Sequence, residues 1–599
     1  MEFGTREELA AKLTRARSVV HLSKLENRLR AFSPGERLVL YIFSATLALS
    51  ALGLLSGVNS AVSVSVPAEG GTLTEGIVEP PRFINPVLAL SQSDEDLTQL
   101  VFSGLMRTVP GLPDTSSNGE SIIPDLAESY TIAPDGTTYT FTIREDAKFH
   151  DGTSLTADDV LFTIQTIQNP EIKSPRRADW EGVSVSSPDR QTVVFKLQHA
   201  YAPFLENTSI GILPKHLWSS VSSEEFPFHP LNTHPIGSGT YKVTSLQTDG
   251  TGAATSYSLS AFDKFTLGVP YINKINFIFY PNEDALIKAF NSGKVGGIAS
   301  ITPAGLPLLN LDNSVVMNVP LPRVFGVFFN QGHAPVLADA SVRSALNAAI
   351  DKTAIVDSVL KGYGVVLEGP IPPGVISNHQ SPKSSGSLSA SERAQKARDI
   401  LSKGGWAYDQ KAGVWKKKKQ TLSISLATSD SPELSATANK IAEFWRAAGV
   451  QVNVKIYPLS ELNTNIIRPR AYDAILFGEV VGRTIDLFAF WHSSQRNDPG
   501  LNLAMYANTK TDSLLSSARA LVSRSERDSL YKSFESIIVK EQPSIFIYSP
   551  EFIYVVPKSL LGVRLGALTT PSERFQNVNE WYSDTERVWN FFTSKTNQI

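Results

Sequence analysis

The chain has 599 residues, 42% of them hydrophobic and 19% charged, so it is long enough for several domains with buried cores. Its net charge of -3 argues against a general nucleic-acid binder, because contacts to phosphates require a basic surface. The chain has no cysteine, which excludes disulfides, thiolate zinc sites, cysteine nucleophiles and a lipid-modified cysteine.

A membrane anchor is predicted near the N-terminus. Residues 38–58 contain no charge over twenty-one positions, about the length that crosses a bilayer. The region before this run is basic and includes Lys12, Arg15, Arg17, Lys24, Arg28, Arg30 and Arg37. The positive-inside rule therefore predicts a single-pass protein of the cell membrane, with a cytoplasmic N-terminus and an extracellular or periplasmic body. The alternative is a cleaved signal peptide, although the 37-residue leader is long for one.

Strands and helices alternate after a short tether at 59–71, where small residues are broken by Pro67 and Gly70. Hydrophobic patterning predicts strands over 72–77, 138–143, 191–197, 271–280, 422–426 and 450–456. It predicts helices over 282–291, 341–350, 391–403 and 432–448. Asp339 and Ser391 are the predicted N-caps of the second and third of these helices.

One stretch, 148–163, joins a predicted strand, turn and helix. Asp151 and Gly152 provide the turn. Thr156 is a suitable N-cap, and Asp159, three residues later, forms an acidic variant of the capping box. An apolar face follows, so we expect an amphipathic helix here.

This stretch belongs to a set of motifs that together resemble those of a protein family. The motifs are Asp125–Tyr130, Pro134–Phe141, Phe149–Gly152 and Leu155–Val160. In order and spacing they resemble the family-5 extracellular solute-binding proteins, the oligopeptide and dipeptide binders of ABC importers. The resemblance extends over roughly 72–569. It implies a helix over 94–105 and strands over 324–330 and 472–478.

The resemblance implies an α/β fold, namely the two-lobed periplasmic-binding-protein fold of type II with an extra inserted domain, here combined with one N-terminal transmembrane helix. The expected segments are a cytoplasmic basic segment (1–37), the anchor (38–58), the tether (59–71), lobe I in three parts (72–105, 236–325 and 540–599), the inserted domain II (106–235) and lobe III (326–539).

The resemblance also implies a ligand cleft between the lobes. The loop 80–86 and the loop after the strand 472–478 border the cleft in this family. The ligand-binding residues expected on this basis are Phe83, Asn85, Phe325, Gly478, Glu479, Val480, Asp486, Trp491 and His492. An aromatic wall and a hydrogen-bond donor at 491–492 would suit a peptide.

The sequence leaves open which residue would bind the free amine of a peptide at this site. In well-known oligopeptide binders an aspartate of the second loop pairs with that amine, and the aligned position here is Arg483. Either Asp486 or Glu479 takes over this role, or the ligand is not a free-amine peptide. Both acids also fit ordinary loop or capping positions.

The expected function is binding. The resemblance implies a monomer that captures a peptide or peptide-like solute and delivers it to an ABC transporter permease. No motif of a metalloprotease, a serine hydrolase or a P-loop is present, so we expect no catalytic residues, metal or cofactor. The alternatives are a ligand sensor that signals through its anchor and a wall-peptide hydrolase built on the same scaffold.

Overall fold

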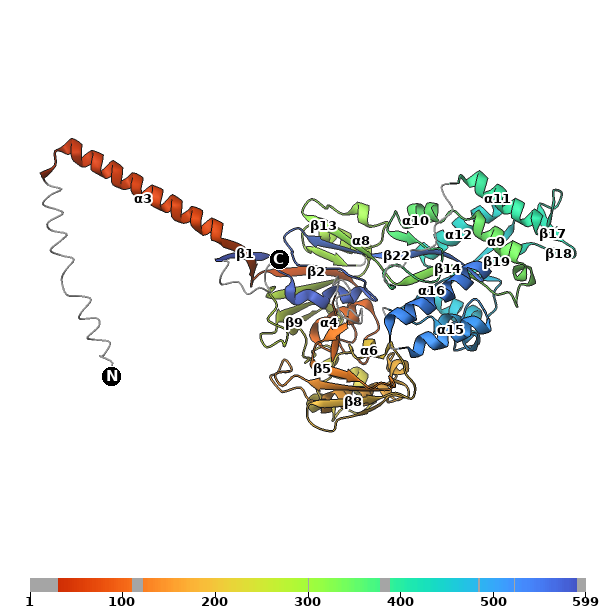
Figure 1. Cartoon of the computed structure of the whole chain (residues 1–599), viewed down its shortest axis with the longest axis horizontal. Helices are drawn as coiled ribbons and strands as arrows, with labels where there is room; N and C mark the ends of the chain where they lie inside the picture. Colours follow the sequence, from red (N-terminus) through yellow and green to blue (C-terminus); the bar gives the residue numbers. More distant parts are fainter. Residues whose placement is uncertain are drawn as a thin grey trace. The chain divides into compact units, whose positions relative to one another are not determined.

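The structure, a computed structural model, describes residues 31–109, 122–299, 301–376, 388–482, 485–521 and 523–589. These residues form two compact units (Figure 1). One consists of the chain up to Ala68 together with the segment from Asp584, and the other spans Glu69 to Ser583. Residues 1–30 of the predicted basic segment and Arg483 lie outside the described residues.

The smaller unit contains the predicted anchor as one long helix, α3 (Pro34–Val62). Ser33 precedes it, and its backbone N–H donates to the Glu36 carboxylate at 2.8 Å, as in a capping box. The part of the helix at Pro34–Asn59 has a mean hydropathy of 2.2. By length and composition this helix can cross a membrane.

A two-stranded ribbon completes the smaller unit. Strand β1 (Ser63–Ala68) pairs antiparallel with β23 (Asp584–Trp589), and Ser63 lies opposite Trp589. The Trp589 indole donates to the Asn59 side chain at 2.6 Å. Part of the predicted tether is therefore a strand, and its partner comes from the C-terminal segment that the sequence assigns to lobe I.

A twelve-stranded sheet runs through the larger unit. Its strands are β2 (Thr72–Val78), β9 (Tyr241–Thr248), β10 (Ala254–Ala261), β11 (Lys274–Tyr280), β12 (Gly297–Ala299), β13 (Ser314–Pro320), β14 (Arg323–Phe329), β15 (Gly364–Val366), β19 (Ser423–Ser429), β20 (Gln451–Tyr457), β21 (Ala474–Val480) and β22 (Ser544–Pro557). The order is β20-β19-β21-β14-β22-β12-β2-β11-β10-β9, and β13 and β15 also pair with β22. Parallel pairs within both halves, β19 with β20 and β2 with β11, are typical of an α/β fold.

Strand β22 connects the two halves of this sheet. Its first residues pair with β14, and its last seven pair with β13. The chain passes from β13 to β14 at Leu321, whose backbone N–H donates to the Pro550 carbonyl at 2.9 Å and whose carbonyl accepts from the Ser549 hydroxyl at 2.5 Å. The two crossings thus lie side by side.

The half of the sheet around β19 is covered by helices. They are α9 (Ala340–Ala349), α10 (Lys352–Val359), α11 (Ala390–Lys403), α12 (Pro432–Ala447), α15 (Thr509–Ala520) and α16 (Arg524–Glu541), with the short α13 (Leu459–Glu461) and α14 (Phe488–Trp491) and a small sheet of β16 (Ala407–Asp409), β17 (Val414–Lys417) and β18 (Gln420–Thr421).

The prediction that Ser391 is the N-cap of α11 is wrong. Ser389 caps α11, because its hydroxyl accepts from the Glu392 backbone N–H and the Glu392 carboxylate accepts from the Ser389 N–H.

The segment predicted as an insertion forms its own sheet, β5 (Ala127–Ile132), β6 (Thr138–Ile143), β8 (Thr192–Lys196) and β7 (Ser184–Ser186), next to a small ribbon of β3 (Met106–Thr108) and β4 (Ile122–Pro124). Helix α5 (Ala157–Gln168) begins where the sequence predicts, and the Asp159 carboxylate accepts from the Thr156 backbone N–H at 2.8 Å. The shorter helices of this segment are α6 (Phe204–Asn207), α7 (Lys215–Trp218) and the 3-10 turn η1 (Arg177–Trp180).

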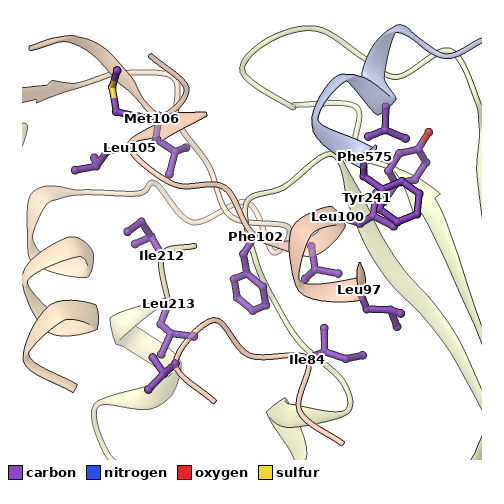
Figure 2. Close-up of a cluster of buried hydrophobic side chains, with 14 of the residues drawn as sticks. Ile84, Leu97, Leu100, Phe102, Leu105, Met106, Ile212, Leu213, Tyr241 and Phe575 are labelled. Carbon is purple, nitrogen blue, oxygen red and sulfur yellow. The ribbon is translucent and has the colours of Figure 1, made fainter. Parts of the chain in front are cut away.

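One hydrophobic core joins the insertion to the sheet around β2. It combines side chains of helix α4 (Gln92–Val101), the insertion, β9 to β11 and the helical segment η8 (Pro571–Glu580). Figure 2 shows Leu97 and Leu100 of α4 close to Tyr241 and Phe575, with Ile212 of the insertion beyond Phe102. Helix α8 (Glu283–Asn291) contributes to a separate cluster that includes Ile298 of β12 and Val555 of β22.

A fully buried cluster of charged side chains links the elements around β2. The Arg574 guanidinium donates to both oxygens of Asp96 at 2.7 and 2.8 Å and also to Glu75. The hydroxyl of Tyr554 donates to the second Glu75 oxygen at 2.9 Å. The cluster therefore links η8, α4, β2 and β22. Phe575 lies against the guanidinium, 4.0 Å from ring centre to carbon.

We expect Arg574→Met to lower the free energy of unfolding by about 3–5 kcal/mol, because it leaves two buried carboxylates without their cation. Urea denaturation of the full chain in detergent measures this loss. Lys440→Met is the matched control, since the Lys440–Glu443 pair is exposed on α12 and contributes at most about 1 kcal/mol. Equal stability of the two variants would contradict the prediction.

Candidate ligand cleft

A cavity of about 600 Å³ lies in the larger unit and is lined mainly by four parts of the chain. These are α4 with the loop that follows it, the insertion around η1 and α6, the loop after β21, and η8 with the residues just before it. The parts are far apart in sequence, so the cavity exists only in the folded chain. Its size is in the range of small-molecule and cofactor sites.

Aromatic side chains form much of the apolar lining. Phe102, Trp180, Tyr201, Phe265 and Phe575 all line the cavity. Most of them belong to the buried core described above, which holds them in place. Rigid aromatic walls of this kind offer large contact areas to a ligand at little entropic cost.

An ion pair lies where the insertion meets the loop after β21. The Arg519 guanidinium of α15 donates to Asp486 Oδ2 at 2.6 Å from Nη2 and 3.0 Å from Nε. The Tyr201 hydroxyl lies 3.5 Å from the same oxygen. Phe488 stacks under the guanidinium at 4.2 Å, and the Ala202 N–H donates to the Arg519 carbonyl at 3.2 Å. Asp486 therefore already has a cation partner within the chain.

A second carboxylate of the lining has one oxygen without a hydrogen-bond partner. Asp125 is only 5% exposed, and its Oδ1 accepts no hydrogen bond from the described residues. Burial raises the pKa of Asp125 to about 6, although Arg107, a hydrogen bond to the Ser103 side chain and Arg144 all act in the opposite direction. A donor on a bound solute would satisfy this oxygen.

Two other lining residues form an ion pair at the cavity wall. Arg176 Nη2 lies 3.0 Å from Glu95 Oε1. Burial nevertheless raises the pKa of Glu95 above its ordinary value, because desolvation outweighs the attraction of Arg176.

Of the predicted ligand residues, Val480 and Asp486 line this cavity. Gly478 packs under the ring of Phe325, since a Cβ atom at this glycine would lie 2.6 Å from it. Phe325 in turn stacks on Tyr548 at 5.2 Å. Neither Gly478 nor Phe325 belongs to the described lining.

The other predicted ligand residues are not among the residues that line the cavity. Asn85 is buried and holds its own loop, donating to Asn232 at 2.9 Å and accepting from the Val87 N–H at 2.9 Å. Phe83 is partly buried against the core, and His492 stacks on Phe488 at 4.0 Å. Trp491 is fully buried among the aromatic side chains of a second core cluster.

Glu479, predicted to bind the ligand, is instead a buried carboxylate without a hydrogen-bond partner in the described part of the chain. It is 2% exposed, and neither carboxylate oxygen makes a hydrogen bond within the described residues. Burial raises the pKa of Glu479 well above 4.5, and the Trp491 indole offsets this only in part. Successive strand residues face opposite sides, so Val480 points to the cavity and Glu479 into the core.

The sequence did not point to several residues of the lining. Glu95, Asp179, Glu206 and Glu573 line the cavity, and Arg519 holds Asp486. Only Glu95 had a local signal, since it lies on a helix that the resemblance places after the loop 80–86. The others meet the cavity through long-range packing, which no local pattern encodes.

The sheet shared by two halves and the cavity that draws on both define a two-lobed solute-binding protein. A family model described as "Bacterial extracellular solute-binding proteins, family 5 Middle" matches residues 121–500. The chain belongs to this family. The predicted resemblance and the predicted type II binding-protein fold are thereby confirmed.

Known relatives resemble the chain over most of its length. It is 26% identical over 528 residues to the oligopeptide-binding protein AppA of Bacillus subtilis, covering 87% of this chain and 93% of AppA. It is 25% identical over 548 residues to the dipeptide-binding protein of Escherichia coli, covering 87% of this chain and 96% of that protein.

Solved structures agree with this assignment. The structure of Bacillus subtilis AppA in complex with a nonapeptide matches with a TM-score of 0.65 and 25% identity, covering 86% of this chain and 99% of AppA. The structure of NikZ from Campylobacter jejuni in complex with Ni(L-His) matches with a TM-score of 0.65 and 27% identity, covering 85% of this chain and 99% of NikZ.

We expect Glu479→Gln to change the pH dependence of stability without changing ligand affinity. Glu479 has a raised pKa in the folded protein, so its protonated form contributes stability below about pH 4.5. This contribution is lost as the pH rises through the folded-state pKa. The variant cannot ionise, so it keeps its stability where the wild type weakens. Urea midpoints measured from about pH 5 to about pH 9 test this, with Glu128→Gln as an exposed control. Parallel curves for wild type and Glu479→Gln would show that Glu479 is ionised in the folded protein.

Proposed function

We propose that this protein captures a peptide or peptide-like solute in the cavity between its lobes and delivers it to an ABC transporter permease, while α3 holds it at the membrane. The observation that carries the proposal is the cavity of about 600 Å³, which is built from both halves of a family-5 fold. The nonapeptide in the related AppA structure supports a peptide as the ligand.

The chemistry of the cavity suits peptide capture. Its lining combines polar groups with aromatic side chains, which matches the mixed surface of a peptide. The nearby crossings at Leu321 and Ser549 give the sheet a narrow connection about which the halves can close. Closure over the solute would then distinguish the loaded from the empty receptor.

We propose binding rather than catalysis. No histidine or lysine lines the cavity within the described part of the chain, so its serines lack the usual side-chain base for nucleophilic attack. The carboxylate Asp486 is engaged by Arg519 and is not placed as a base. These features favour a receptor over a wall-peptide hydrolase.

Native mass spectrometry of the full chain, purified in detergent, tests ligand class. We expect co-purifying species with peptide masses. Adding a released peptide back at about one hundred times its Kd should stabilise the protein by about 2.7 kcal/mol, because it binds only the folded state. If the co-purifying species are not peptides, and no added peptide shifts the unfolding midpoint, peptide capture is wrong.

Cysteine labelling tests the anchor, because the chain has no cysteine of its own. We expect Ser129→Cys, on the exposed edge of the insertion, to react with an impermeant maleimide on intact cells. Ser18→Cys should react only after lysis. Loss of the N-terminal segment from the mature protein would instead identify α3 as part of a cleaved signal.

A further inference from the structure

The C-terminal end of α3 meets the last described residues of the chain. Strand β1 follows α3 directly, and Ser63 at its start lies opposite Trp589 at the end of β23 (Figure 1). The Trp589 indole N–H donates to Asn59 Oδ1 at 2.6 Å. The last turns of the helix and the end of the ribbon therefore lie together, although they are about as far apart in sequence as the chain allows.

Trp589 differs from the other tryptophans in its exposure. The chain has eight tryptophans, and Trp589 is 45% exposed. The others are at most 4% exposed, namely Trp180, Trp218, Trp406, Trp415, Trp445, Trp491 and Trp581. An indole ring carries a large apolar surface with one polar N–H, so it is favoured where one part of it meets apolar groups and another meets polar ones. An exposed ring beside an apolar helix suits a partner with both kinds of surface.

The depth of Trp589 follows from the length of the helix. The charge-free run at 38–58, as a helix, spans about 31 Å, close to the hydrocarbon thickness of a bilayer at about 30 Å. Asn59 follows this run directly. When α3 spans a membrane, Asn59 therefore lies where hydrocarbon gives way to headgroups. Because Asn59 accepts from the indole, the ring lies at the same depth, where tryptophan is enriched in membrane proteins.

The face of β23 that carries Trp589 suits the headgroup region further out. Successive strand residues point to opposite sides, so Arg587 shares this face, about 7 Å along the strand from Trp589. The headgroup region extends about 5–7 Å beyond the hydrocarbon. The exposed Arg587 guanidinium is thus at the level of lipid phosphates, with which it can form charge-assisted hydrogen bonds. The acids Asp584 and Glu586 point to the other side of the strand.

We propose that the end of β23 binds the surface of the phospholipid bilayer, with the Trp589 ring at the boundary between acyl chains and headgroups and Arg587 among the phosphates. This inference rests on the proposed anchoring by α3 and adds a second membrane contact, made by the other end of the chain. It holds the end of the ribbon near Ser63 against the bilayer, so the ribbon does not swing freely about its connection to α3.

Tryptophan fluorescence of the full chain in phosphatidylcholine vesicles tests the proposal. The lipids carry bromine atoms, which quench indole emission, either near the headgroup or near the methyl end of the acyl chains. The other tryptophans are buried, so Trp589 is the ring that lipid can reach. We expect bromines near the headgroup to quench wild-type emission more than bromines near the methyl end. Trp589→Phe should remove the quenched part of the emission.

A matched variant moves the same reporter along the ribbon. Thr585→Trp, made in the Trp589→Phe chain, places an indole on the same exposed face about 14 Å further along the strand. We expect little quenching from this position by either lipid. The substitution changes an exposed residue, and the unfolding midpoint shows that the variant folds.

Flotation of the chain with the vesicles reports the anchor separately. A chain that floats but whose wild-type emission neither lipid quenches would overturn the contact of Trp589 and leave the anchor standing. Stronger quenching by the deep bromines would overturn the placement at the boundary. Equal quenching at positions 585 and 589 would show a ribbon lying flat on the bilayer and would also overturn it. A chain that does not float would contradict the anchor itself, and this inference would fall with it.

Discussion

The buried cluster of Arg574 with Glu75 and Asp96 is the constraint on which the ligand cleft depends. Three charges lie without any exposure to water, so none can lose its partners without a large cost. Asp96 neighbours Glu95 on α4, and Arg574 lies between Glu573 and Phe575 on η8. Because those three neighbours line the cavity, the cluster fixes two of its walls at once.

A second constraint concerns the connection between the halves of the sheet. β22 belongs to both, and its pairing changes from β14 to β13 around Ser549 and Pro550, where it also pairs with β15. Pro322 and Pro550 have no backbone N–H, so neither of them donates a backbone hydrogen bond where the two crossings meet. Two adjacent crossings form a narrow connection, which suits a receptor whose halves close on a ligand.

Local sequence patterns predicted the elements well and the cleft poorly. The strand at 138–143 and the helix after Thr156 follow from alternation and capping, which are local properties. The resemblance then supplied the fold. The resemblance could not show which way the Glu479 side chain points. That direction follows from the alternation of side chains along β21, which turns Glu479 inward and Val480 outward. Nor could the resemblance supply the Arg519 partner of Asp486, which is 33 residues away.

The ribbon of β1 and β23 bears on how the receptor could be shed from a cell. Ala68 lies opposite Asp584, so both connections to the larger unit leave the ribbon at the same end. A protease that cuts only one connection therefore leaves a covalent path or a set of six strand pairs between the body and α3. Release of the body requires both cuts, or one cut and the separation of the strands.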